Sequence, residues 1–111
     1  MSLVSTLSDV VVEAAENGNL VTVKEYLRSN PFHLEASKNN GLTLLHLASR
    51  YGHLEIIMYL KTAGANFESK TSCEQTPLNL ASICDHLEVV KYHVEAWEHR
   101  AASLGRLAIV K

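Results

Sequence analysis

The chain has 111 residues, of which 47% are hydrophobic and 20% are charged, and its formal net charge is −2 at pH 7. This is one domain's worth of chain with the composition of a globular protein, so a largely disordered chain is excluded. The small net charge gives no indication of a general nucleic-acid or membrane-surface binder. No apolar run approaches the roughly 20 residues that a membrane-spanning helix needs.

The cysteines and the N-terminal residues indicate the cellular compartment of the protein. Cys73 and Cys84 are the 2 cysteines, and in a sequence of this kind they are usually free thiols rather than a disulfide framework. The first residues lack the charged and then apolar pattern of a secretory signal peptide. We therefore expect an intracellular protein of the cytoplasm, with the nucleus as the alternative.

The first predicted element is a pair of helices between residues 8 and 36. Gly18 ends the first of these helices, because glycine adopts the left-handed conformation of a helix end without a steric penalty. Residues 20–29 form the second helix. Residues 13–20 match residues 47–54 in the middle of the chain, with an offset of 34 residues.

The middle of the chain carries the clearest copy of this pattern. Thr43 is a candidate N-cap, because its hydroxyl can accept a hydrogen bond from a free amide of the first helical turn. Gly52 ends that helix, and residues 54–63 predict a second helix whose apolar side chains share one face. Residues 67–75 are polar and have no helical period, so we expect an extended finger there.

The same pattern returns in the last third of the chain. Residues 43–61 recur 33 positions later as residues 76–94, with 9 identities. Pro77 stands at the first helical position, where its missing N–H costs nothing, and Asp85 replaces the turn glycine as one of the few residues that tolerate a left-handed backbone. A fixed period of this length is typical of stacked helical units that build an extended surface. The predicted fold class is all-α, a helix–turn–helix solenoid with short β-turn fingers.

These motifs resemble the ankyrin repeat family. Residues 41–48, 52–57 and 64–66 are similar to one complete repeat, and residues 75–81 and 86–90 to a second. Residues 8–36 resemble an N-terminal capping unit. The resemblance covers about residues 8–97 and implies a single domain that binds another protein. Its expected parts are an N-terminal capping repeat at 8–40, a central repeat at 41–73, a C-terminal repeat and cap at 74–105, and a tail at 106–111.

Several positions depart from the family's pattern. Leu44 replaces the proline, Glu74 the finger glycine and Asn79 the histidine. In the family this histidine bonds the finger backbone, so we expect His46 to do so and the amide of Asn79 to do similar work. After Val94 the copy ends, and we expect a longer last helix, to about residue 103, that caps the stack. The sequence leaves three alternatives for the tail at residues 106–111. It packs on this cap, it begins a fourth unit, or it binds a partner.

A metal site is disfavoured by the spacing of the repeat, despite 6 histidines and 2 cysteines. His53 and His86 are equivalent, so we expect them about 8–10 Å apart, the usual distance between packed helices. Zinc ligands lie within about 2.0–2.3 Å of one ion. We expect each turn histidine to hydrogen-bond the neighbouring loop instead. No phosphate-binding loop, nucleophile elbow or paired-carboxylate signature is present, so we predict no cofactor, no metal and no catalytic residue.

The candidate binding surface follows from the resemblance. In the family, finger tips and the exposed ends of the first helices form one concave face, and its variable positions match residues of this chain. The partner-binding candidates are Asn39, Asn40, Leu42, Arg50, Tyr51, Ser72, Gln75, Ile83 and Cys84, with Glu16, Asn17 and Cys73 on the same face. We expect Arg50 and Tyr51 to be the anchors, because both residue types are favoured at interface centres. The alternative is that Leu42, Tyr51 and Ile83 pack between adjacent units.

The predicted function is a non-catalytic protein–protein interaction module. We expect a monomer that binds neither nucleic acid nor membrane. The alternative is a regulatory or targeting domain excised from a larger multidomain protein or enzyme. A small metal-sensing protein is a third class, which a stoichiometric zinc content would reveal.

Overall fold

The computed structural model describes residues 7–38 and 40–96. Its named helices are α1 (Asp9–Asn17), α2 (Leu20–Ser29), α3 (Leu44–Tyr51), α4 (Leu54–Ala63) and α5 (Pro77–Ile83), with a short 3-10 helix η1 (Pro31–His33) after α2. Residues 87–96 are also helical. Within these ranges the one isolated β-bridge joins Ser37 to Thr43, in the first finger. The all-α prediction is confirmed.

The predicted second helices match α2 and α4, which span Leu20–Ser29 and Leu54–Ala63. The cap expected after Val94 lies largely outside the described residues, and the tail at residues 106–111 lies wholly outside them. No helix in the described part of the chain is long and apolar enough to cross a membrane.

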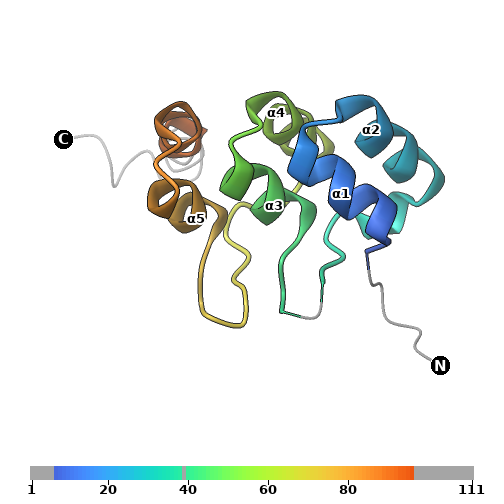
Figure 1. Cartoon of the computed structure of the whole chain (residues 1–111), viewed down its shortest axis with the longest axis horizontal. Helices are drawn as coiled ribbons and strands as arrows, with labels where there is room; N and C mark the ends of the chain where they lie inside the picture. Colours follow the sequence, from blue (N-terminus) through green and yellow to red (C-terminus); the bar gives the residue numbers. More distant parts are fainter. Residues whose placement is uncertain (1–6, 39, 97–111) are drawn as a thin grey trace, which may run out of the picture.

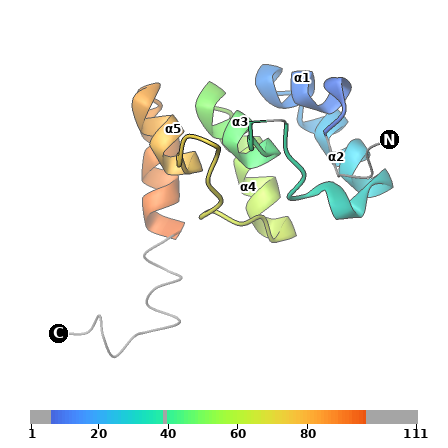
Figure 2. The same cartoon turned by 90° about the horizontal axis from the view of Figure 1, so that it is seen from below.

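The helices form a stack of three units in two layers. α1, α3 and α5 lie side by side in one row, which we call the first helices (Figure 1). α2, α4 and the helix at residues 87–96 form the second row, which we call the second helices (Figures 1 and 2). The first unit is therefore α1 with α2, the second is α3 with α4, and the third is α5 with the helix at residues 87–96.

Matching caps begin the first helices of the second and third units. The Thr43 hydroxyl accepts from the His46 amide at 3.3 Å, and the His46 ring accepts from the Thr43 amide at 3.1 Å. The same reciprocal pair joins Thr76 and Asn79, at 3.2 and 3.0 Å. The predicted N-cap Thr43 is confirmed, and Thr76 caps the equivalent helix in the same way. Asn79 therefore caps its own helix as His46 does.

The turns inside the units have the predicted left-handed backbone. φ is 82° at Gly18, 77° at Gly52 and 63° at Asp85. Space also requires glycine at the first two positions. A Cβ on Gly18 would lie 2.7 Å from Nδ1 of His53, and one on Gly52 would lie 2.6 Å from Nδ1 of His86. Each turn histidine therefore packs directly on the glycine of the preceding unit.

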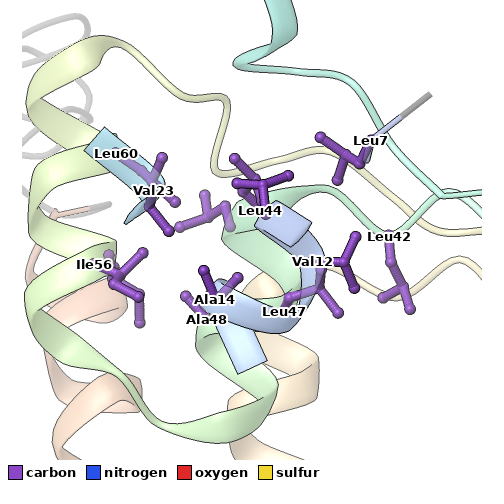
Figure 3. Packing of buried hydrophobic residues seen from close by; sticks show 14 of the residues in the cluster. Leu7, Val12, Ala14, Val23, Leu42, Leu44, Leu47, Ala48, Ile56 and Leu60 are labelled. Carbon is purple, nitrogen blue, oxygen red and sulfur yellow. The ribbon is translucent and has the colours of Figure 1, made fainter. Parts of the chain in front are cut away.

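The hydrophobic core fills the space between the two rows of helices (Figure 3). Ala14 and Ala48 are buried at equivalent positions of α1 and α3, and such small side chains let neighbouring helices approach closely. Val23, Ile56 and Leu60 supply the larger buried side chains from the second helices. The core therefore runs along the whole stack, between the first helices and the second helices.

Candidate functional site

The two fingers are tight turns that precede α3 and α5. Two backbone hydrogen bonds of 2.8–2.9 Å close each of them, joining Lys38 to Leu42 and Gly41 in the first finger and Thr71 to Gln75 and Glu74 in the second. The fingers are also joined to each other. The backbone amide and the hydroxyl of Ser72 both donate to the carbonyl oxygen of Asn40 at 2.9 Å. The finger tips are therefore fixed relative to one another.

His46 connects the start of α3 to the second finger. Its Nε2 lies 3.0 Å from the carbonyl oxygen of Ser69 and 3.1 Å from that of Gln75. Because both partners are acceptors, Nε2 carries the proton, and Nδ1 is left to accept from the amide of Thr43. Burial lowers the pKa of His46, although the hydrogen bonds to Gln75 and Ser69 oppose this shift. The expected role of His46, bonding the finger backbone, is confirmed.

The turn histidines hold the other end of the first helices. Nε2 of His53 donates to the carbonyl oxygen of Glu16 at 2.7 Å, and Nε2 of His86 donates to that of Arg50 at 2.9 Å. Each bond reaches from one unit to the last turn of the preceding first helix. The turn histidines therefore hydrogen-bond the neighbouring unit, as expected, but the acceptors lie in the last turn of a helix and not in a loop. The end of each first helix is fixed to the next unit.

Most candidate binding residues lie on the exposed side of this framework. Tyr51 is 42% exposed and Ile83 is 66% exposed, so neither is packed away between units. The Arg50 guanidinium lies 5.8 Å from the centre of the Tyr51 ring, within cation–π range. The other exposed candidates are Asn40, Ser72, Cys73 and Cys84, while Gln75 is half-buried and Asn39 lies outside the described residues.

Leu42 is a correction to the predicted surface. Its side chain is only 5% exposed and belongs to the same apolar cluster as Val12 and Leu47 (Figure 3). Leu42 immediately precedes the N-cap Thr43, a position where an apolar residue commonly packs against the first turns of its helix. The expectation that Leu42 is a surface residue is therefore wrong.

The sequence interpretation missed a buried polar pair between the second and third units. Oγ of Ser49 lies 2.8 Å from Nε2 of His93, and the two residues are 0% and 3% exposed. The Phe67 ring packs edge-on against the imidazole, with ring centres 4.8 Å apart. Burial lowers the pKa of His93 to about 4. The repeat carried a signal for this burial, because His93 falls 33 residues after Leu60, which is fully buried.

A cavity of about 700 Å³ lies beside this pair, between the end of α4 and the third unit. Its lining includes Lys61, Phe67, Glu68, Leu78 and His93. Over residues 7–38 and 40–96, no group of three or more histidine, cysteine or acidic side chains is placed to hold a metal ion.

The geometry defines a helical repeat protein whose fingers and first helices are joined into one continuous framework. The family model for ankyrin repeats, in three copies, matches residues 11–97. The chain therefore belongs to the ankyrin repeat family, whose members are in general protein–protein interaction modules.

Two known proteins share this similarity over part of their length. The chain is 34% identical to human M-phase phosphoprotein 8 over 64 residues. The aligned residues make up 57% of this chain and 7% of that protein. It also resembles a chain in the solved complex of a predatory endopeptidase from Bdellovibrio bacteriovorus with an immunity protein, with a TM-score of 0.75 and 32% identity. That match covers 80% of this chain and 46% of the other. The chain thus spans less than half the length of either protein.

Proposed function

We propose that this chain is a non-catalytic interaction module that binds a partner protein through its concave face. This face consists of the finger tips and the exposed ends of α1, α3 and α5. The observation that carries the proposal is the set of bonds beneath it, in which His46, His53 and His86 fix each part of the framework to the next unit. A regulatory or targeting unit of a larger protein would use the same face.

The proposed mechanism is preorganisation. The link from Ser72 to Asn40 and the bonds from His46 to the second finger already order the loops in the free protein. Binding then loses little conformational entropy, because the loops do not have to be ordered on contact. A short stack offers a small face, so we expect an interface near the lower end of the usual range of about 1,200–2,000 Å².

Arg50 and Tyr51 are the proposed anchors. Both are exposed at the end of α3, and their side chains lie within cation–π range of each other. At the equivalent positions of the third unit, Ile83 at the end of α5 and the following Cys84 are also exposed. The face therefore offers a guanidinium, an aromatic ring and an aliphatic side chain on neighbouring units, a combination suited to an apolar partner segment that also carries hydrogen-bond acceptors.

The test begins with affinity capture from the native source, followed by titration of the purified partner against defined variants. Arg50→Ala with Tyr51→Ala should weaken binding by about 2 kcal/mol or more, roughly 30-fold, because loss of anchor residues has this effect. The melting temperature should change little, since both side chains are exposed and surface changes cost about 0.5 kcal/mol or less.

The matched control is Glu25→Ala with Arg28→Ala, which alters two exposed side chains of α2 on the other row of helices. The control should bind like the unmodified protein. A folded Arg50 and Tyr51 variant that binds at full affinity would mean that the partner uses another face. Unfolding of that variant would instead show that Tyr51 supports the fold.

A further inference from the structure

The interface between the second and third units contains a buried polar pair, Ser49 and His93. The interface between the first and second units has apolar residues at the equivalent positions. Ser49 and His93 are equivalent to Ala15 and Leu60, one unit earlier. All four residues are buried. Because Ala15 and Leu60 carry no ionisable group, the buried imidazole of His93 is a feature that responds to pH and that the first interface lacks at this position.

We propose that the Ser49–His93 hydrogen bond makes the docking of the third unit on the second unit sensitive to acid. The pair is short, at 2.8 Å, and the imidazole is enclosed by Ser49 on α3 and by Phe67 on the loop after α4. A proton added to this ring would place a cation in a buried, largely apolar contact, where an ion loses its hydration. This property does not depend on the proposed binding face or on any partner.

Within the described residues, charged groups of both signs lie around the ring. Lys61 at the end of α4 and Glu68 on the loop line the same cavity as His93, one of each sign. On α3, Arg50 is exposed at the helix end. The sequence of α5 contains no ionisable side chain. On its own helix the neighbours of His93 are Tyr92, which packs near Phe67, and the exposed Lys91 and Glu95.

The direction of the effect follows from linkage. The pKa of His93 is about 4 in the docked state, whereas an exposed histidine titrates near 6.5. The docked state therefore binds fewer protons, and its stability is complete above about pH 6.5 and is lost as the pH falls toward 4. Between pH 7.5 and 5.0 the equilibrium constant for opening the third unit should rise about 30-fold.

The opening should be local rather than global. Each unit of a repeat stack contacts only its neighbours, so a terminal unit can open while the remainder stays folded. His46 complicates the measurement, because burial also lowers its pKa and it bonds the second finger through Ser69 and Gln75. A variant that removes His93 and keeps His46 separates the two.

The repeat itself supplies that variant. Ser49→Ala with His93→Leu gives the second interface the same two residues as Ala15 and Leu60 in the first. Amide hydrogen exchange followed by NMR at pH 7.5 and 5.0 would report the opening of each helix. In the unmodified protein, protection of α5 and residues 87–96 should fall about 30-fold, after correction for intrinsic exchange, relative to that of α1 and α2. In the double variant the fall should be much smaller, because only His46 remains to respond at this interface.

The control is His33→Gln, which removes a histidine of the first unit and should keep the acid response. The proposal is overturned if the double variant retains the full response, or if the third unit of the unmodified protein shows none. An NMR titration of the His93 ring in the unmodified protein is independent of whether the variant folds. A midpoint well below 6 supports the proposal, and a midpoint near 6.5 overturns it.

Discussion

Replacing Gly52 by alanine tests two features of the turn between α3 and α4 at once. The residue has φ of 77°, and an alanine Cβ would lie 2.6 Å from Nδ1, 2.8 Å from Cε1 and 2.9 Å from Cγ of His86. The left-handed backbone should cost about 1–2 kcal/mol for alanine. The His86 ring must then move, which strains the packing and weakens its 2.9 Å bond to the Arg50 carbonyl. The total loss of unfolding free energy should be roughly 3–5 kcal/mol.

Gly64 provides the matched control for the backbone contribution alone. Its φ is 102°, and no atom of the described residues lies within 4 Å of the position of its Cβ. Gly64→Ala should therefore lose only the left-handed strain, about 1–2 kcal/mol. The difference between the two variants measures the contact with His86.

The same contact can be isolated by a double-mutant cycle. His86→Ala removes the ring that obstructs the new methyl group, so Gly52→Ala should cost less in this background, with a coupling of about 1–3 kcal/mol. Urea denaturation followed by helical circular dichroism gives all the required free energies. The reasoning is refuted if Gly52→Ala and Gly64→Ala lose the same stability, or if the cost of Gly52→Ala is unchanged without the His86 ring.

Two further stability predictions use the same assay. Leu47→Ala should cost about 2–5 kcal/mol because Leu47 is 1% exposed, whereas Leu87→Ala should cost about 0.5 kcal/mol or less because Leu87 is 70% exposed; equal losses would contradict this core assignment. Glu74→Gly should raise the unfolding free energy by about 0.5–1 kcal/mol, because Glu74 has φ of 63° and its ion pair with Lys70 is exposed. A lower stability for Glu74→Gly would show that its side chain supports the finger.

The helices and their ends were predictable because the signals are local. Thr43 and Thr76 cap helices through amides three residues away, and Gly18 and Gly52 end helices through their own backbone conformation. Nothing beyond a few neighbouring residues is needed to place these features. The 33-residue period then indicates that such elements repeat, and stacking is the way in which repeated amphipathic helices bury their apolar faces.

The side-chain environments were less predictable because they depend on the neighbouring unit. Leu42 belongs to a finger, and its burial depends on packing against the core rather than on its own segment. The Ser49–His93 pair joins residues 44 positions apart, so a local pattern cannot reveal that the two side chains meet. Aligning the copies places His93 at the position of Leu60 and indicates burial, but the hydroxyl that hydrogen-bonds the ring is known only from the packed units.

Differences between copies of the repeat have two distinct physical origins. Arg50 and Tyr51 differ from Ile83 and Cys84 at exposed positions. A substitution there changes the unfolding free energy little, but it alters the surface that a partner would contact. His46 differs from Asn79 for a reason inside the fold. Both side chains cap their own helix, but His46 also reaches the finger of the next unit, and only a side chain with a second, distant donor can make that bond. A difference between copies therefore bears on binding only when its side chain is exposed; when the side chain is buried, it reflects the neighbouring unit.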